Sequence, residues 1–283
     1  MPGFARTIAA LSLLSLPLAA QQPDVETTRV ADGVYRFRYQ AHNTMFVTTP
    51  DGVVAFDPIN ADAAAQYAAA IRQAAPAARL RAIVYSHDHA DHASGADILR
   101  AAFGDTVPII AHAAAHAPIV AAASADQPPP TLTFDDEMTL HFGGRTVELH
   151  YVGPSHSDNM IVAVVPDARV AFAVDFVSHD RMGYRDLSSF RFPGQFEAID
   201  RLLALEFHTI VFGHGPNGDR GSVERQLAYY RDLERAVRAA VAEGWTEDQA
   251  AERVRLPAYE GWDRYADWFP MNVRGMYRWV RGG

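Results

Sequence analysis

The chain has 283 residues, of which 49% are hydrophobic, and this is enough to bury the core of one large domain or two small ones. Its formal charge of −9 argues against a nucleic-acid partner, because surfaces that bind phosphate backbones are basic. The sequence has no cysteine, which excludes disulfides, thiol nucleophiles and thiolate metal ligands, and no lysine, which excludes a Schiff-base mechanism.

The first twenty residues have the pattern of a secretory signal peptide. Arg6 supplies a positive charge, residues 8–18 form a short apolar run, and Ala19 and Ala20 are small residues suited to cleavage. A membrane anchor is the weaker alternative, because the run is too short to span a bilayer comfortably. We therefore expect a periplasmic or secreted protein without stable membrane insertion, whose residues 21–283 form a single domain with a C-terminal helical extension.

Short strands and helices alternate in the first half of this domain. Pro118 is expected to interrupt one helix, and Gln127 begins a stiff linker that continues with three prolines. The predicted elements are strands at 34–39, 43–48 and 53–56, a helix at 61–75, a strand at 80–85, a helix at 93–103, a strand at 107–111 and a helix at 113–123.

The second half repeats this order of strands followed by helices. Two such runs predict two sheets that pack face to face with helices outside, which is an α/β fold with four αββα layers. The predicted elements are strands at 138–142, 146–152, 160–165 and 170–175, a helix at 196–205, a strand at 209–212, and helices at 222–243, 246–254 and 262–280.

The sequence His87-Asp88-His89-Ala90-Asp91-His92 directly follows the buried strand at 80–85. A solvated turn has no need for three histidines and two aspartates in six positions. Imidazole and carboxylate are ligands that suit zinc, and a zinc ion with an open coordination position makes bound water nucleophilic near neutral pH. The cluster therefore predicts a metal site.

Three further polar residues stand where predicted strands end. His156 follows the strand that ends at Val152, Asp175 ends the strand 170–175, and His214 follows the strand 209–212. Loops at one edge of a sheet converge on a shared cleft, so these side chains are expected to join the first cluster.

Together these residues resemble the metallo-β-lactamase-fold superfamily of hydrolases. The resemblance covers nearly all of the mature chain, and its HxHxDH pattern followed by His, Asp and His is highly specific. It implies an αββα sandwich with a catalytic groove at one edge of the sheets. It implies a first metal on His87, His89 and His156, a second on Asp91, His92 and His214, and a bridging Asp175.

The resemblance also implies the chemistry. Two zinc ions, with iron or manganese as alternatives, would hold a hydroxide that attacks the carbonyl carbon of a small-molecule ester, thioester, lactone or lactam. Asp91 is the predicted catalytic residue, which orients the hydroxide and moves a proton to the leaving group. Asp88 is expected to hold a ligand histidine in its tautomer. Substrate-pocket candidates are His42, His179 and Tyr184.

Asp175 indicates which branch of the superfamily the chain resembles. Many β-lactamases of this fold carry cysteine or serine where this chain has Asp175, and thioesterases and lactonases carry a bridging aspartate. A β-lactamase remains an alternative, as does an oxidoreductase resembling the mononuclear iron persulfide dioxygenases. Lactonases of this fold tend to have a tyrosine shortly after the bridging aspartate. Here that stretch reads Phe176-Val177-Ser178-His179, and Tyr184 lies farther on. The exact substrate, the native metal and the oligomeric state stay open.

Overall fold

The first half of the chain forms seven strands and four helices in the computed structural model, which describes residues 24–104 and 106–282. The predicted signal peptide lies outside the described residues. The elements are β1 (Val25–Ala31), β2 (Val34–Tyr39), β3 (His42–Thr49), β4 (Gly52–Phe56), α1 (Ala61–Ala74), β5 (Leu80–Val84), α2 (Ala90–Ala93), α3 (Ala96–Phe103), β6 (Ile109–His112), α4 (Ala113–Ala122) and β7 (Leu132–Phe134).

The second half forms six strands, with one helix between the fourth and fifth of them and further helices after the sixth. The N-terminal sheet has the strand order β1-β2-β3-β4-β5-β6-β7, and the C-terminal sheet has the order β13-β12-β11-β10-β9-β8. The elements of the second half are β8 (Glu137–Phe142), β9 (Arg145–Tyr151), β10 (Ile161–Val165), β11 (Val170–Ala173), α5 (Gly194–Ala204), β12 (Thr209–Phe212), β13 (Gly218–Asp219), α6 (Arg220–Ala242), α7 (Glu247–Arg253), the 3-10 turn η1 (Pro257–Tyr259) and α8 (Tyr265–Gly282).

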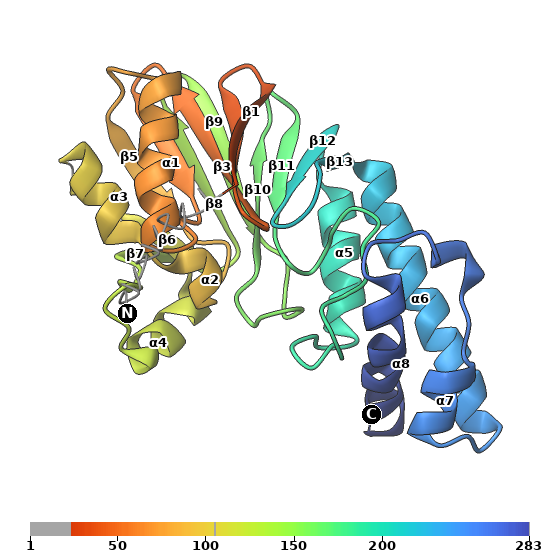
Figure 1. Ribbon diagram of the computed structural model, residues 1–283. Helices are drawn as coiled ribbons and strands as arrows, with labels where there is room; N and C mark the ends of the chain where they lie inside the picture. The colour runs from red at the N-terminus through yellow and green to blue at the C-terminus, as the bar shows by residue number, and fades with distance from the viewer. Residues whose placement is uncertain (1–23, 105, 283) are drawn as a thin grey trace, which may run out of the picture.

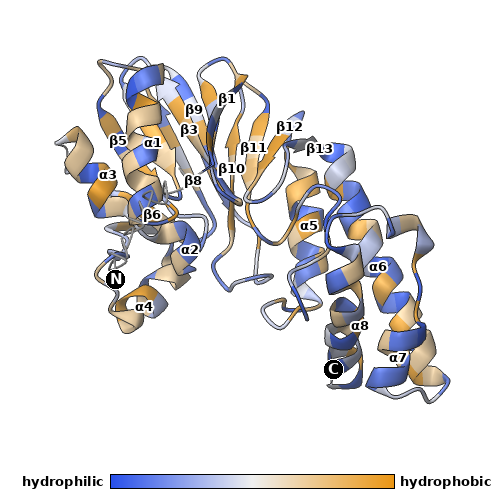
Figure 2. Cartoon of the chain, in the orientation of Figure 1, coloured by the Kyte–Doolittle hydropathy of each residue, from blue (hydrophilic) through white to orange (hydrophobic). Residues whose placement is uncertain are grey.

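The four predicted αββα layers are confirmed (Figure 1). The two sheets meet over an apolar core in which the rings of Phe56 and Phe172 lie 5.4 Å apart. A second core lies between the N-terminal sheet and helices α1 and α3, and a third between the C-terminal sheet and helices α5 to α8. Figure 2 shows the apolar strands of both sheets between helices of mixed polarity. Burying one such phenylalanine contributes about 1.5–3 kcal/mol.

Strand direction brings the functional loops to one edge of the sandwich. Strands β4, β5 and β6 are parallel, and so are β11 and β12. Parallel neighbours end at the same edge of a sheet, so the residues that follow β4, β5, β11 and β12 come together there. Strand β3 runs antiparallel to β4, and its first residue, His42, therefore lies at that edge too.

The structure differs from the prediction in a few elements. The helix predicted at 93–103 begins only at Ala96, as α3, and Ala93 instead ends the short helix α2. Gly95 lies between them with a φ of 91°, and a Cβ at this position would lie 2.6 Å from the carbonyl oxygen of Asn60. Helix α4 continues through Pro118, which was expected to interrupt it. Strands β1, β7 and β13 were not predicted, because they are edge strands or short and carry little apolar pattern.

The C-terminal helices continue outward from the C-terminal sheet (Figure 1). Asp219 and Ser222 form a capping box at the start of α6, and α6 then packs against α8. The ring of Tyr229 on α6 lies 5.4 Å from that of Trp262, just before α8. No helix in the described ranges is long and apolar enough to cross a membrane.

Candidate metal centre

The predicted ligand histidines surround the carboxylate of Asp175 at one edge of the sandwich. Oδ2 of Asp175 lies 3.6 Å from Nε2 of His87, 3.3 Å from Nε2 of His92 and 3.5 Å from Nε2 of His156. Oδ1 lies 3.0 Å from Nε2 of His214. Asp175 is therefore the common neighbour of ligands that come from three different segments, those that follow β5, β9 and β12.

The donor atoms form two groups, each able to hold one cation. One group is His87, His89, His156 and Asp175, and the other is His42, His92 and His214. Within each group one ligand atom per residue lies within 4.8 Å of all the others. The structure thus provides two adjacent sites with Asp175 between them.

Unpaired buried atoms show that the donor set fits a metal. Nε2 of His87, both ring nitrogens of His92 and Oδ1 of Asp175 are buried and lack a hydrogen-bond partner in the described part of the chain. Two ligands that each sit about 2.1 Å from a tetrahedral cation are about 3.4 Å apart. The separations around Asp175, 3.0 to 3.6 Å, have this size. A divalent cation would satisfy the atoms that the protein itself leaves unpaired.

The outward nitrogens of three ligands are held by neighbouring groups. The Ser86 hydroxyl lies 2.9 Å from Nδ1 of His87, and the Ser189 hydroxyl lies 3.2 Å from Nδ1 of His156. The carbonyl of Ala41 lies 2.8 Å from Nδ1 of His214. Each contact fixes the ring and leaves Nε2 directed inward, as metal-ligating histidines require.

Asp57 supports two ligands and was missed in the sequence. Its carboxylate accepts hydrogen bonds from the Ser86 N–H at 2.7 Å and the Ser86 hydroxyl at 2.6 Å, and it lies 3.5 Å from Nδ1 of His92. Because the Ser86 hydroxyl donates to Asp57, its oxygen is left to accept from Nδ1 of His87. The signal was available in the sequence, since Asp57 directly follows the predicted strand 53–56 as Asp175 ends the strand 170–175.

Two carboxylates at this edge have left-handed backbone. The φ of Asp175 is 61° and that of Asp57 is 21°. A non-glycine residue with positive φ carries a strain of about 1–3 kcal/mol, which persists where the surrounding structure fixes the conformation. Here the strain directs both carboxylates from their strand ends toward the histidines.

The protonation states of the first group suit a cation. Burial, with neighbouring imidazoles such as His92, holds the pKa of His87 well below its usual value. Burial also lowers the pKa of His156 to about 4. Both rings are therefore neutral near pH 7, as metal ligands must be.

The second group is different in the absence of a cation. Burial lowers the pKa of His92, but the carboxylates of Asp175 and Asp57 outweigh it and raise this pKa well above its usual value. Burial raises the pKa of Asp175, but the adjacent His92 and His214 hold it well below its usual value. His92 and Asp175 thus form an ion pair in which His92 carries a proton, and a cation that binds to His92 must displace that proton.

The predicted catalytic Asp91 lies at the rim. Its side chain is 60% exposed, and Oδ2 lies 3.4 Å from Nε2 of His42. The contact with His42 holds the pKa of Asp91 well below its usual value, so the carboxylate is ionised. Asp88 has a different partner from the one expected, because its carboxylate accepts from Ser157 at 2.7 Å and not from a histidine.

The three substrate-pocket candidates are separated by the structure. His42 lies among the ligands, but Nδ1 of His179 lies 3.0 Å from the Ser222 hydroxyl at the start of α6. Tyr184 is half exposed and its ring packs 5.3 Å from that of Trp268. Neither His179 nor Tyr184 lines the cavity beside the metal centre.

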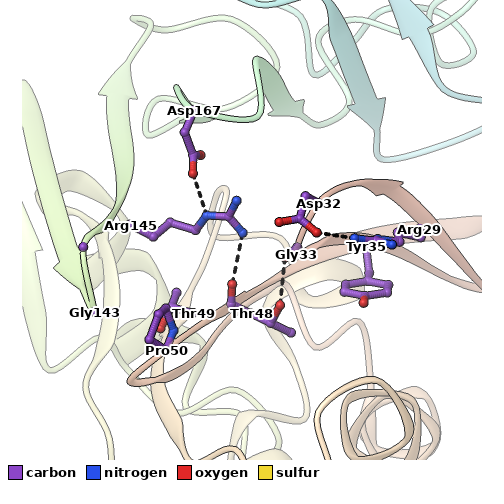
Figure 3. Close-up of a pocket in the computed structure, with 11 residues that line it drawn as sticks. Arg29, Asp32, Gly33, Tyr35, Thr48, Thr49, Pro50, Gly143, Arg145 and Asp167 are labelled. Atoms are coloured by element: carbon purple, nitrogen blue, oxygen red, sulfur yellow. Dashed lines mark hydrogen bonds and ion pairs between the residues drawn. The ribbon is translucent and has the colours of Figure 1, made fainter.

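That cavity has a volume of about 620 Å³. Its lining includes His89 and His156 of the first ligand group, and Arg191, which is paired with Asp158 at 2.9 Å. A second cavity of about 450 Å³ lies around Arg145 at the other end of strands β3 and β9 (Figure 3).

Comparisons with known proteins agree with this geometry. Residues 38–214 match the family model described as the metallo-beta-lactamase superfamily. The 2,4-dinitroanisole O-demethylase subunit alpha of Nocardioides sp. (strain JS1661) is 29% identical over 188 residues, which are 65% of this chain and 54% of the relative. The chain thus spans about half the length of this curated relative.

A solved structure shares the fold. The metallo-beta-lactamase from Pontibacter korlensis superposes with a TM-score of 0.64 and 20% identity, over 72% of this chain and 98% of that chain. The family match includes every residue of both ligand groups and ends at His214, before α6.

Proposed function

The chain belongs to the metallo-beta-lactamase superfamily of metal-dependent enzymes, and we propose that it is a dinuclear zinc hydrolase. Its substrate would be a small molecule with an ester, thioester, lactone or lactam carbonyl. One observation carries the proposal, which is the pair of ligand groups that meet at Asp175. A secreted or periplasmic location is part of the proposal and comes from the pattern of the first twenty residues.

A divalent metal supplies Lewis acidity, which polarises a carbonyl and lowers the pKa of bound water to about 7. The chain contributes position and charge. Asp175 brings a buried negative charge to both groups, and Ser86 and Ser189 fix the rings of His87 and His156. Asp91 is ionised and exposed at the rim, where its carboxylate can orient a water molecule or accept a proton for the leaving group.

The polar cavity beside the first group is the proposed substrate pocket. Arg191 is its only arginine or lysine among the described lining residues, and it is half exposed. Its guanidinium is paired with Asp158 at 2.9 Å, and Asp88 adds a second carboxylate to the lining, so the charged groups of the pocket do not favour an anionic substrate.

A second candidate reaction comes from the curated relative. Its name assigns it O-demethylation of 2,4-dinitroanisole, an aryl methyl ether. Hydrolysis of such an ether would consume one water molecule and give the phenol and methanol. The identity of 29% supports including this substrate in the test.

The test is a substrate panel on zinc-loaded protein. It contains a p-nitrophenyl ester, a thioester, an acyl-homoserine lactone, a chromogenic cephalosporin and 2,4-dinitroanisole. We expect turnover of an ester or thioester that is lost on chelation and restored by zinc, with His141→Ala, on the exposed strand β8, as the control. Turnover of only the cephalosporin or only the ether would overturn the ester preference. Native iron with thiol-dependent oxygen uptake would overturn the hydrolase itself.

A further inference from the structure

His42 is the one member of the two ligand groups that the HxHxDH pattern and its later residues do not contain. We propose that His42 is a direct ligand of the second metal, together with His92 and His214. The inference rests on the metal-dependent function proposed above. It assigns three imidazoles to each metal, on either side of Asp175.

The two sets of rings have similar separations, between 4.5 and 5.6 Å in the first and between 4.7 and 5.6 Å in the second. In the first group, the ring centroids of His87, His89 and His156 are 4.5, 4.7 and 5.6 Å apart. In the second group, His42 lies 4.7 Å from His214 and 5.5 Å from His92, and the latter two are 5.6 Å apart. His42 thus occupies, toward its neighbours, the position of a third ligand.

A set of hydrogen bonds fixes His42 beside His214. The backbone N–H of Asn43 donates to the carbonyl of Gly213 at 2.7 Å, and its side-chain amide donates to the carbonyls of Phe212 at 2.9 Å and Gly215 at 2.8 Å. In the other direction, Nδ1 of His214 bonds to the carbonyl of Ala41 at 2.8 Å. Residues on both sides of His42 are therefore joined to residues on both sides of His214, which makes the two rings one preorganised unit.

The contact between His42 and Asp91 is compatible with ligation. At 3.4 Å, Nε2 of His42 and Oδ2 of Asp91 are farther apart than the 2.7–3.2 Å typical of a hydrogen bond, so the carboxylate holds the ring only weakly. The His42 side chain is 27% exposed, so the ring is mostly buried and yet turned toward the ligands.

A third imidazole would change the preference of the second site. Nitrogen donors favour zinc, cobalt and nickel over manganese and magnesium, which prefer oxygen. We therefore expect the second site to hold zinc or cobalt tightly, and to discriminate against manganese more than a site with two imidazoles would.

The experiment compares His42→Ala and His42→Gln in the full chain. Glutamine keeps an N–H that can donate to Asp91 but is a poor ligand for zinc or cobalt. We expect both variants to keep the first metal and to bind the second more weakly by more than the roughly 10- to 100-fold typical of losing an outer-shell partner, measured by titration with cobalt and by metal content after dialysis. Both should also lose one set of the hyperfine-shifted imidazole signals in the NMR spectrum of the cobalt protein.

His141→Ala is the matched control, because it removes an exposed imidazole from strand β8. The proposal is overturned if His42→Gln retains the second metal with unchanged affinity and an unchanged set of imidazole signals, since His42 would then act only as a donor to Asp91. Circular dichroism confirms that each variant is folded. These measurements do not use turnover, so they stand even if the proposed hydrolysis fails.

Discussion

The two ends of the β-sandwich each contain a polar cavity, but they differ in how their polar groups are satisfied. At the end opposite the metal centre, Nε of Arg145 lies 2.9 Å from Asp167 and Nη1 donates to the carbonyl of Thr48 at 3.1 Å (Figure 3). Nearby, Arg29 pairs with Asp32. At the metal end, Nε2 of His87 and both ring nitrogens of His92 are buried and lack a hydrogen-bond partner among the described residues.

This difference distinguishes a structural contact between the two sheets from a reactive site. Arg145 is 13% exposed and joins the two sheets by bonding to groups on both, so its charge is used within the fold. The metal end leaves several ring nitrogens and a carboxylate oxygen without a hydrogen-bond partner in the described structure, and such a concentration of unpaired atoms around one point is what a cation would satisfy. Cavity size and the presence of charge do not distinguish the two ends, since both cavities are large and polar.

The most severe test removes the residue common to both ligand groups. Asp175→Ala should lose at least one metal and lower kcat/KM by a factor on the order of a hundred or more, because both sites lose a buried anionic ligand. Metal content by mass spectrometry and kinetics with the best substrate of the panel measure the effect. Unchanged metal content would refute the bridging role.

A smaller effect on metal affinity is expected at Asp57, which contacts the predicted ligands and is not itself a predicted ligand. Asp57→Asn should weaken metal binding about 10- to 100-fold, because the carboxylate positions His92 directly and His87 through Ser86. A competition titration against a chromogenic chelator gives the affinity. If binding equals that of the wild type, Asp57 serves the fold alone.

Lowering the pH should weaken metal binding. In the metal-free protein the pKa of His92 is raised, so its proton is held near neutral pH and must leave when a cation binds. Each displaced proton makes the affinity fall by up to about tenfold per pH unit below that pKa. Titrations at several pH values, with the released protons counted in weak buffer, check the sign. An affinity independent of pH would contradict this protonation state.

The smallest effect on the metal centre is expected from a substitution at the opposite end of the sandwich. Arg145→Ala should leave metal content and turnover unchanged and lower the free energy of unfolding by about 1–2 kcal/mol, because the Thr48 carbonyl loses its donor and the ion pair with exposed Asp167 is worth little. Urea denaturation measures the loss. A large fall in turnover would show that the two ends are coupled.

The sequence predicted the layers of the fold and the residues at the strand ends well, because both depend on local pattern. Apolar strands such as β5 and β11 have a clear signal, and the HxHxDH cluster follows one of them directly. The break before α3 was not predictable, since Gly95 is required by its close approach to Asn60, a contact between separate elements.

The roles of individual side chains were less predictable for the same reason. The partner of Asp88 is Ser157, 69 residues away, and His42 meets His214 across an even longer separation. Pattern and spacing indicate that a residue stands at the correct edge. They do not indicate which neighbour it faces there, because this depends on loop paths that only the packed sheets determine.

The hydrogen bonds that join Asn43 to Phe212 and Gly215 also bear on how the protein is made. They close a loop of more than 160 residues, since the two partners are separated by 169 and 172 positions. Such closure is entropically costly and occurs late in folding. During synthesis, the N-terminal sheet and the ligand histidines His42, His87, His89 and His92 leave the ribosome before β12 and His214 are made. A metal held by His42, His92 and His214, as proposed above, would therefore be bound in its final geometry only after the chain has been built past residue 214, and its loading would report on completed folding.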